Sequence, residues 1–465
     1  MTVEALCAAL GEASVLTGEA MAPWCRDWTG NYAWAPLCVV RPRSRDEVAA
    51  VLRIANEAGM PVVPVGGNTG LSGGTSGDAS IMLSLDRMNA IREIRPEARL
   101  AVVEAGVILS TLHEAVEAQG LSFPMTFGAK GSCTMGGILA TNAGGSNVLR
   151  YGNTRDLVLG VEAVLADGRV VDLMSELHKD NTGLNLRNLL IGSEGILGVI
   201  TAAVVKLVPQ PKAYATAFLG MDDVGAALGL LNRLQEVTGG QVEAFEFMPR
   251  RYVEEYARLH PEARLPFDDQ YDVNILVELG ATAPRDVEAG PDGQPPIAGA
   301  LEEALGEMLE REELTDAVVA QNEGQRRAFW ALREAAAEVS TARPAIICDV
   351  AVPLDRVAEF LGRADARLAG MDRDALTVVV AHLGDGNVHY AVWTEKTGEA
   401  RGEIMEAVEE EALALGGSFS AEHGIGLAKQ PAMTRFKDPV ALEMMRAIKT
   451  ALDPKGILNP GKVLG

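Results

Sequence analysis

Apolar and polar positions follow periods along the chain that predict both helices and strands. Between Val48 and Ala55 the apolar residues recur every three or four positions, which places them on one face of a helix. Ser44 is the expected N-cap of this helix, and Glu47, three residues later, would complete a capping box. The run from Pro61 to Val65 then predicts a short buried strand.

Two later runs, Leu376 to Ala381 and Val388 to Trp393, are rich in Val and aromatic residues and predict a β-hairpin. Asp385-Gly386 between them is the dipeptide that a two-residue type I′ turn prefers, because both turn positions need a positive φ. A turn centred there pairs His382 with His389. The two imidazoles would be direct cross-strand neighbours, with Cβ atoms ~5 Å apart on one face of the ribbon.

The histidine pair predicts a site for a divalent metal. Glu422 would add a carboxylate, giving three ligands and open positions for substrate, which is the arrangement of a catalytic zinc. His423 would then lie beside the metal without binding it. The chain has six histidines, and three of them fall in these two short segments. The alternative is that each histidine is a hydrogen-bonded, half-buried residue of the hairpin.

Three glycine-dense loops border predicted strands. Gly66 to Gly74 has five glycines in nine positions, Gly131 to Gly145 is similar, and Gly192 to Gly198 precedes a predicted strand from Val199 to Val205. Glycine lets backbone N–H groups approach a pyrophosphate closely. The loops match neither G-x-G-x-x-G nor a P-loop, so neither a Rossmann nicotinamide site nor a P-loop is supported. One such loop would be unremarkable, but three imply an extended ligand between sheets.

Length and charge limit the class of protein. A chain of 465 residues suggests two or three domains. The formal net charge of −23 argues against nucleic acid or an anionic membrane surface as a partner, because both would be repelled. An anionic substrate would need a local positive centre such as a metal or a buried arginine. Solubility alone also explains the acidity.

The cysteines and the N-terminus point to a reducing compartment. The five cysteines are odd in number and never form a C-x-x-C pair, which argues against disulfides and iron–sulfur clusters. The first residues lack a basic n-region, and no apolar run approaches ~20 residues. We therefore expect a cytoplasmic protein with no transmembrane segment. The cysteines are Cys7, Cys25, Cys38, Cys133 and Cys348.

These motifs together resemble the flavin domain of the vanillyl-alcohol oxidase superfamily. Within it the chain is similar to the FAD-dependent D-2-hydroxyacid dehydrogenases, which act on D-2-hydroxyglutarate, D-lactate or glycolate. The resemblance runs from about Tyr32 to the C-terminus, with the motifs in the expected order. Besides the histidine segments, it is carried by Pro64-Val-Gly-Gly-Asn-Thr-Gly-Leu-Ser-Gly-Gly74, Thr141-Asn-Ala-Gly-Gly145, Arg150-Tyr-Gly-Asn153, Arg155-Asp-Leu157, Lys179-Asp-Asn-Thr-Gly183, Gly192-Ser-Glu-Gly195 and Leu458-Asn-Pro-Gly461.

The resemblance implies an α+β fold. A PCMH-type FAD-binding domain of two α+β subdomains would precede a substrate domain with a large antiparallel sheet. The expected segments are an N-terminal extension (1–35), the FAD-binding domain (36–211), the substrate domain (212–430) and a C-terminal segment returning to the FAD domain (431–465). Within the substrate domain, four prolines between Ala281 and Gly299 predict a surface excursion.

The same resemblance implies that FAD is the cofactor. Relatives that tether the flavin use a histidine in the pyrophosphate loop, and Gly66 to Gly74 contains none, so we expect non-covalent FAD. The residues expected to contact it are Pro64, Gly66, Gly67, Asn68, Thr69, Gly70, Leu71, Gly73, Gly131, Ser132, Thr134, Gly136, Gly137, Asn142, Ala143, Gly144, Glu194, Gly195, Gly198, Ile200 and Asn459.

The resemblance also implies roles in chemistry. His382, His389 and Glu422 would hold Zn²⁺ or another divalent metal. His423 would take the hydroxyl proton while hydride leaves the α-carbon for the flavin. Arg333 matches the family's arginine for the substrate carboxylate, although it could instead be an exposed helix residue paired with Glu334 or Glu338. Adjacent residues of an extended segment point to opposite faces, so Gly424 must bend the chain if both Glu422 and His423 are to reach one site.

Two departures from the family pattern keep the substrate open. D-2-hydroxyglutarate dehydrogenases carry a lysine before an Asp-x-x-x-Pro strand, whereas Ala345 to Pro353 has no basic residue. Tyr390 and Ala391 follow His389, where those enzymes often have an asparagine. D-Lactate or another monocarboxylate hydroxy acid therefore stands beside D-2-hydroxyglutarate.

Family analogy extends to partners. It suggests a non-oxygen electron acceptor, such as electron-transfer flavoprotein, a quinone or a cytochrome, and a homodimer. The alternatives are a flavin subunit of a glycolate oxidase-like complex, or a non-catalytic metal- and flavin-binding protein.

Overall fold

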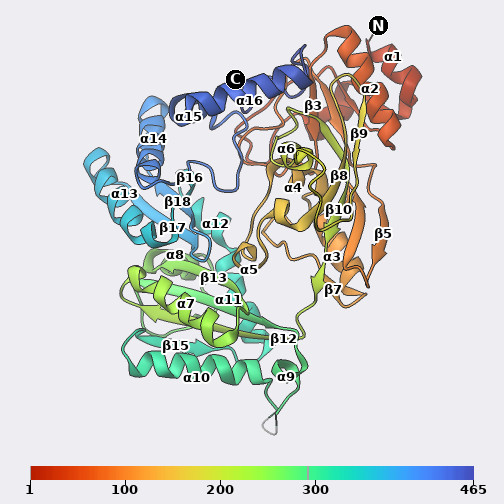
Figure 1. Cartoon of the computed structure of the whole chain (residues 1–465). Helices are drawn as coiled ribbons and strands as arrows, with labels where there is room; N and C mark the ends of the chain where they lie inside the picture. Colours follow the sequence, from red (N-terminus) through yellow and green to blue (C-terminus); the bar gives the residue numbers. More distant parts are fainter. Residues whose placement is uncertain (1, 291–292, 465) are drawn as a thin grey trace. The chain divides into compact units, whose positions relative to one another are not determined.

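Two units, each with its own hydrophobic core, make up the described residues 2–290 and 293–464 of this computed structural model (Figure 1). Unit 1 comprises Met1–Gly144, Gly152–Pro209 and Glu422–Gly465, and unit 2 comprises Gly145–Tyr151 and Gln210–Ala421. The chain thus returns to unit 1 at Glu422, earlier than the expected residue 431. Pro291, part of the predicted surface excursion, lies outside the described residues.

The first sheet of unit 1 carries the first glycine-rich loop at the end of one strand. Its strands run in the order β1 (Val15–Leu16), β2 (Cys38–Val40), β4 (Ile81–Ser84) and β3 (Val62–Val65), and β4 is parallel to both neighbours. Buried aliphatic side chains fill these short strands, as expected of a parallel sheet covered on both faces.

The predicted helix is α2 (Arg45–Ala58), and it packs against this sheet through its buried apolar face. Ser44 caps it as expected, since its Oγ accepts the N–H of Glu47 at 3.2 Å. The Glu47 carboxylate reaches one residue further than a capping box requires and accepts the N–H of Arg43 at 2.7 Å. The predicted N-cap is therefore confirmed, and the predicted reciprocal bond to Ser44 is not formed.

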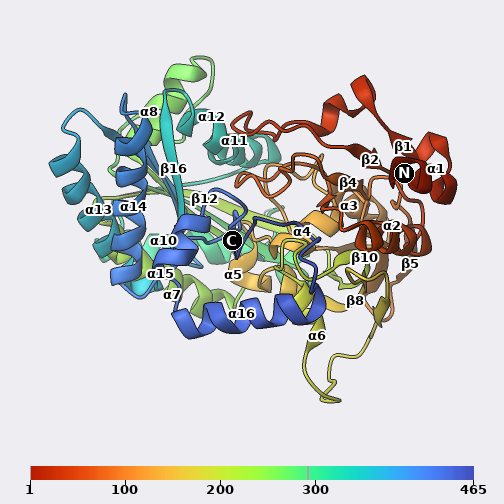
Figure 2. The same cartoon turned by 90° about the horizontal axis from the view of Figure 1, so that it is seen from above.

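The second sheet of unit 1 is antiparallel and has the order β5 (Ile91–Arg95), β6 (Leu100–Glu104), β10 (Val199–Lys206), β8 (Val158–Val164) and β9 (Val170–Leu173). Strand β10 confirms the strand predicted after the third glycine loop. A long loop between β9 and α6 (Leu186–Leu190) extends away from this sheet in Figure 2 and contains the Lys179–Gly183 motif. The remaining elements of unit 1 are β7 (Leu121–Ser122), β11 (Val208–Pro209), α1 (Thr2–Leu10), α3 (Leu109–Glu117), α4 (Met135–Thr141), α15 (Gln430–Phe436) and α16 (Pro439–Leu452).

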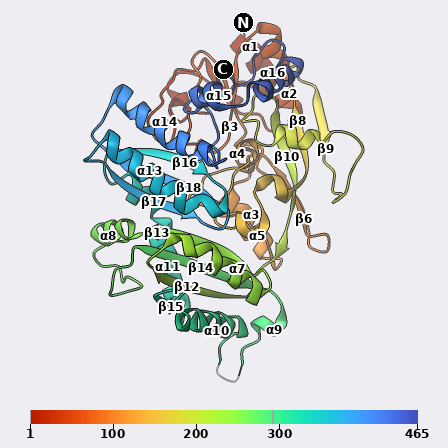
Figure 3. The same ribbon diagram turned by 60° about the vertical axis from the view of Figure 1, so that its left-hand side comes forward.

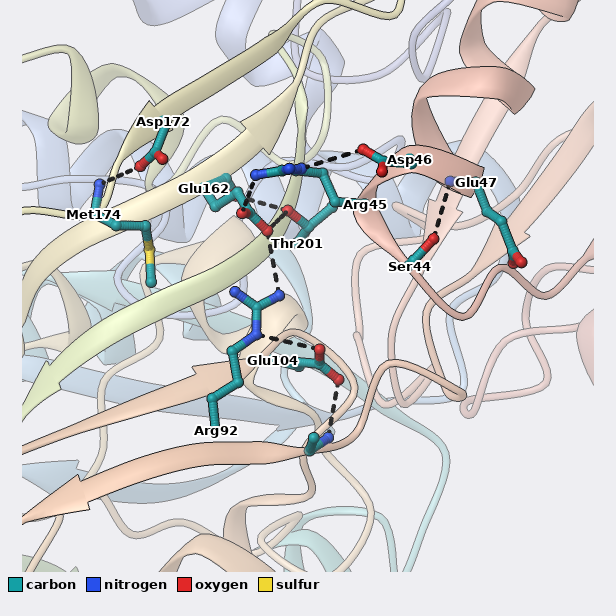
Figure 4. Close-up of polar contacts among 11 residues, drawn as sticks. Ser44, Arg45, Asp46, Glu47, Arg92, Glu104, Glu162, Asp172, Met174 and Thr201 are labelled. Carbon is teal, nitrogen blue, oxygen red and sulfur yellow. Dashed lines mark hydrogen bonds and ion pairs between the residues drawn. The ribbon is translucent and has the colours of Figure 1, made fainter.

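A buried carboxylate joins helix α2 to this second sheet. Glu162 on β8 is 4% exposed, and its oxygens lie 3.0 Å from Arg45 Nη1, 3.4 Å from Arg92 Nη2 and 2.8 Å from Thr201 Oγ1 (Figure 4). Two arginines and a hydroxyl compensate the cost of burying this charge. The network connects α2, β5, β8 and β10, and so fixes the two halves of unit 1 to each other.

Among the described residues, unit 2 is built on one antiparallel sheet of seven strands, ordered β15-β12-β14-β13-β17-β18-β16. The predicted α+β fold with a large antiparallel sheet is confirmed. Helices α7, α10, α13 and α14 cover one face of the sheet, and α7 and α13 lie in front of the strands in Figure 3. Helices α8, α11 and α12 cover the other face.

The strands of this sheet are β12 (Ala213–Met221), β13 (Val242–Pro249), β14 (Val273–Ala281), β15 (Asp316–Val319), β16 (Ala345–Ala351), β17 (Leu376–His382) and β18 (Asn387–Trp393). The helices of unit 2 are α5 (Val148–Tyr151), α7 (Ala227–Thr238), α8 (Arg250–Leu259), α9 (Pro284–Val287), α10 (Pro296–Glu310), α11 (Glu323–Glu334), α12 (Ala336–Ser340), α13 (Val357–Met371) and α14 (Gly398–Ala414). Of the helices described in the two units, none is both long enough and apolar enough to cross a bilayer.

The predicted hairpin exists, but its turn and its register differ from the prediction. Strands β17 and β18 pair His382 with Asn387 and Val380 with His389, so the connection has four residues rather than two. Only Gly386 has a positive φ, +80°, whereas a type I′ turn needs two such residues. The Asp385 carboxylate instead accepts the N–H of Asn387 at 3.1 Å and stabilises the wider turn.

Candidate active site

The first glycine-rich loop of unit 1 offers a row of unused hydrogen-bond donors. Within the described part of the chain, the backbone N–H groups of Gly67 to Leu71 donate no hydrogen bond. Asn68 has a φ of +54°, and its side chain donates to the Arg26 carbonyl at 2.8 Å, which fixes the loop's conformation. A side chain on Gly70 would meet open space. Unused backbone N–H groups in a glycine-rich loop of this kind can bind phosphate oxygens.

The second glycine loop packs directly on the first. A Cβ on Gly67 would lie 2.1 Å from the Ser132 carbonyl oxygen, and one on Gly66 would lie 2.5 Å from Thr134 Oγ1. The Thr134 hydroxyl is buried and has no hydrogen-bond partner among the described residues. A hydroxyl without a partner beside free N–H groups fits a polar ligand such as the FAD pyrophosphate.

Some predicted FAD residues also serve the packing of unit 1. Gly136 brings α4 against Ala105, since a Cβ there would lie 2.8 Å from the Ala105 Cβ. The Asn142 Oδ1 atom accepts the N–H of Arg155 at 2.9 Å, and Asn142 has a φ of +51°. Ile200 is a buried residue of β10.

Glu194, one of the predicted FAD residues, holds a backbone segment through its carboxylate. Its carboxylate oxygens accept the N–H groups of Ile425 at 2.7 Å and Gly426 at 2.8 Å. Burial raises the pKa of Glu194, and the two N–H groups and Lys429 oppose that shift. Gly424 has a φ of +72°, and a Cβ there would lie 2.9 Å from Glu194 Oε1. The bend expected at Gly424 is therefore present, and the Glu194 carboxylate packs against it.

The first glycine loop also holds the segment that contains His423. Ser72 Oγ donates to the His423 carbonyl at 3.0 Å, and the Ser72 carbonyl accepts the N–H groups of Leu427 and Ala428. Asn459 connects the same elements, because its Nδ2 donates to the carbonyls of Gly74 at 3.0 Å and Glu194 at 2.8 Å. The expected base and the expected cofactor loop are thus joined within unit 1.

In unit 2, the two histidines of the hairpin lie on one face of the sheet. His389 is opposite Val380, two residues before His382, so the rings are diagonal neighbours with centroids 5.4 Å apart. A ring nitrogen of His382 lies within 4.8 Å of a ring nitrogen of His389. The pairing therefore differs from the prediction, but the two rings remain close enough to share an ion.

A carboxylate lies behind each histidine. His382 Nδ1 is 2.8 Å from Glu246 Oε1, and His389 Nδ1 is 3.5 Å from Asp349 Oδ1. A carboxylate at Nδ1 orients a metal-binding imidazole and leaves its Nε2 atom for the ion. The donor set therefore fits a divalent metal. Neither Glu246 nor Asp349 was expected from the sequence.

Arg333, on α11, is buried against the same carboxylate. Its Nε lies 2.7 Å from Glu246 Oε2, and its Nη2 lies 3.4 Å from the ring nitrogens of His382. Burial would raise the pKa of Glu246, but Arg333 and His382 hold it at about 2. Arg333 is only 7% exposed, so it is not the exposed helix residue of the alternative interpretation.

Glu422 follows directly on the sheet of unit 2 and begins the return to unit 1. The N–H of Ala421 donates to the Asp349 carbonyl at 3.3 Å, and Glu422 is the next residue. Within unit 1, a Cβ on Gly144 would lie 2.6 Å from Glu422 Oε1. The four residues expected to carry the chemistry thus come from both units: His382 and His389 from unit 2, Glu422 and His423 from unit 1.

Comparison with known proteins identifies the family. Residues 210–463 match the family described as FAD linked oxidases, C-terminal domain, and residues 36–174 match the FAD binding domain family. A mitochondrial D-2-hydroxyglutarate dehydrogenase of Bos taurus is 38% identical over 442 residues, which cover 94% of this chain and 78% of that protein. The chain belongs to the FAD-dependent D-2-hydroxyacid dehydrogenase family. The predicted family is confirmed, and the protein is an FAD-dependent oxidoreductase.

Bacterial members of this dehydrogenase family are also similar over nearly their whole length. The D-2-hydroxyglutarate dehydrogenase of Xanthomonas citri pv. viticola is 34% identical, covering 94% of this chain and 91% of that protein. Solved structures share the fold at lower identity. An alkyldihydroxyacetonephosphate synthase has a TM-score of 0.73 at 17% identity, covering 99% of this chain and 86% of that one. A p-cresol methylhydroxylase has the same TM-score and identity, covering 99% and 96%.

Proposed function

We propose that this dehydrogenase oxidises the α-hydroxyl of a D-2-hydroxy acid to the 2-oxo acid, assisted by a divalent metal, and passes the electrons to a non-oxygen acceptor. The observation that carries the proposal is the pair His382 and His389 on one sheet face, each with a carboxylate at its Nδ1. The names of the curated relatives support the substrate class.

The metal would be held by His382 and His389, with Glu422 as third ligand. A bound divalent ion would supply a Lewis acid for the substrate hydroxyl and carboxylate, lowering the hydroxyl pKa. The chain's net charge of −23 makes such a positive centre necessary for an anionic substrate. Glu246 lies buried behind His382 with Oε1 2.8 Å from Nδ1, so it would accept the Nδ1 proton and orient Nε2 towards the ion.

His423 is the proposed base. FAD, when bound, supplies the acceptor for the hydride that leaves the α-carbon, and His423 takes the hydroxyl proton. The backbone of His423 is fixed by Ser72, and its neighbours Ile425 and Gly426 are fixed by Glu194. This anchoring joins the backbone of the proposed base to the glycine loop of unit 1, which supports a fixed position for the base.

Arg333 would face the substrate carboxylate from α11. Its Nη2 lies beside the His382 ring, so a carboxylate bound near the metal would be within reach of it. Arg333 is already paired with Glu246, and the pair is neutral overall. We therefore assign Arg333 a part in orienting the substrate rather than in supplying net positive charge.

Two candidate substrates remain. The curated relatives named D-2-hydroxyglutarate dehydrogenase favour D-2-hydroxyglutarate. Strand β16, which pairs Asp349 with His389, has no basic residue to receive a second carboxylate, and this favours D-lactate or another monocarboxylate. Both belong in the same experiment.

The test is anaerobic bleaching of the bound flavin by D- and L-lactate, D-2-hydroxyglutarate, D-malate and glycolate, before and after metal removal with a chelator. We expect bleaching by a D-acid that disappears on chelation and returns with Zn²⁺. His382→Ala should abolish it, whereas His260→Ala, a histidine of the same unit that contacts Glu338, should not. Bleaching that persists in verified metal-free protein would contradict the metal's role. Flavin that no hydroxy acid reduces would contradict the function itself.

A further inference from the structure

Lys462, near the C-terminus, is a buried cation that forms no ion pair with the described residues. It is 6% exposed, and its Nζ donates to the Pro460 carbonyl at 3.0 Å. An ammonium carries three donors, so two remain for another group. In the described ranges 2–290 and 293–464, no carboxylate lies within ion-pair distance of this ammonium. In a chain of net charge −23, such isolation needs an explanation.

The protein alone does not compensate the charge. Burial lowers the pKa of Lys462, and the Asp78 carboxylate only partly opposes this. Asp78 is engaged elsewhere, since its Oδ1 accepts the N–H of Ala35 at 2.8 Å. A buried charge is costly unless it is paired and hydrogen-bonded. The site around Lys462 therefore has the character of an anion site.

The position of Lys462 connects it to the cofactor loop. Three residues earlier, Asn459 Nδ2 donates to the carbonyls of Gly74 and Glu194, and the buried Asn459 Oδ1 atom has no hydrogen-bond partner in the part of the chain that the structure describes. One residue later, the N–H of Val463 donates to the Gly426 carbonyl at 3.1 Å. A Cβ on Gly426 would lie 2.1 Å from the Ser72 carbonyl oxygen. The segment around Lys462 is thus hydrogen-bonded to Gly74, at the C-terminal end of the glycine loop, and to Gly426, which packs on Ser72 of that loop.

We propose that Lys462 is a cofactor-binding residue whose ammonium pairs with an anionic group of FAD. The cofactor offers two groups of this chemistry. One is the pyrophosphate. The other is the pyrimidine edge of the flavin ring, which becomes negative when the flavin is reduced. In either case the cofactor supplies the negative charge that pairs with the ammonium, so FAD and Lys462 stabilise each other.

The test compares Lys462→Met with Lys455→Met, a lysine of the same unit with an exposed side chain. FAD is titrated into each apoprotein, and the melting temperature of each apoprotein is recorded. We expect Lys462→Met to weaken FAD binding about tenfold or more, as for loss of one charge-assisted hydrogen bond. Its apoprotein should melt no lower than wild type, because an unpaired buried charge has been removed. Lys455→Met should change neither quantity.

Riboflavin titration and the midpoint potential distinguish the two anions. Pairing with the pyrophosphate predicts weakened FAD binding with riboflavin affinity and potential unchanged. Pairing with the flavin ring predicts weakened riboflavin binding and a lower potential, because the reduced, anionic ring loses its counter-charge. Lys462→Arg should restore most of the FAD affinity in either case. FAD affinity within twofold of wild type, with the same potential, would overturn the proposal. So would a destabilised or unfolded Lys462→Met apoprotein, because the ammonium would then have its partner within the protein.

Discussion

The Nδ1 atom of His382 lies 2.8 Å from Oε1 of Glu246, a carboxylate with no exposed surface. Arg333 binds the other oxygen of the same carboxylate, and the pKa of Glu246 is held at about 2 against the opposing effect of burial. The carboxylate therefore stays ionised throughout the neutral range and fixes the orientation of the imidazole. In the proposed metal site, Glu246 would orient His382 without binding the metal itself.

Glu246→Gln should lower the affinity for Zn²⁺ by about 10- to 100-fold, the usual effect of removing a carboxylate behind a metal-binding histidine. Competition with a chromophoric chelator measures this. The matched control is Glu278→Gln, which changes a buried carboxylate of the neighbouring strand β14 that binds Arg326, Thr216 and Trp330. Equal metal affinity in the two variants would contradict the role given to Glu246.

Glu194→Gln should reduce kcat about tenfold while leaving FAD bound. The amide keeps one acceptor oxygen but loses the other, so one of the N–H groups of Ile425 and Gly426 is left buried without a partner, and the segment carrying His423 loosens. Steady-state kinetics and the flavin content of the purified variant provide the measurement. Glu104→Gln, a carboxylate of β6 that contacts Arg92, is the control. A variant with reduced flavin content, whose kcat per bound flavin is unchanged, would place Glu194 at the cofactor instead.

Gly67→Ala should destabilise the apoprotein by about 1–3 kcal/mol, because the new methyl group would lie 2.1 Å from the Ser132 carbonyl oxygen and the two glycine loops must separate. Gly70→Ala, three residues later in the same loop, meets open space and should leave the stability of the apoprotein unchanged. Denaturant unfolding of both apoproteins measures the difference. Similar destabilisation in both would mean that the loops do not pack as described.

The thiol of Cys133 should resist alkylation in the native protein at pH 8. Burial raises its pKa from 9.0 to about 11, so the thiolate is scarce until the solution is strongly alkaline. Because the folded pKa is raised, folding favours the protonated thiol, and the corresponding stability is present below pH 9.0 and lost as the pH rises towards about 11. Peptide mapping after iodoacetamide treatment should show label at Cys133 only once the protein is unfolded. Rapid labelling of the native protein would contradict the burial.

The sequence predicted the placement of the histidines better than it predicted their pairing. The Asp-Gly dipeptide suggested a two-residue turn, but only Gly386 adopts a positive φ, and the true partner of His382 is Asn387. The error is a shift of two residues. Because side chains alternate with a period of two, such a shift leaves both imidazoles on the same face. The wrong turn therefore did not affect the prediction that the two histidines lie close together on one face.

Other parts of the site could not be predicted, because they depend on contacts between residues far apart in the chain. Glu246 is 136 positions from His382, and the bonds from Glu194 to Ile425 and Gly426 span 231 and 232 positions. Local periodicity and short motifs contain no information on such pairs. Motif position marked Glu194 as a residue of the cofactor site, but only its hydrogen bonds show which group it holds.

The way unit 1 is assembled from separated stretches has a consequence for synthesis of the protein. Strand β3, which leads into the glycine loop, exchanges backbone hydrogen bonds with the extreme C-terminus: Val62 donates to the Ile457 carbonyl and accepts from the Asn459 N–H, each at 2.8 Å. Unit 2 ends at Ala421, so its whole sequence is translated before residues 457–459. The strand that leads into the cofactor loop is translated early, but it gains these two bonds only after residues 457–459 have been made. A chain that lacks residues 457–459 loses both bonds to β3, so we expect it to load less flavin, and its flavin content reports on this pairing.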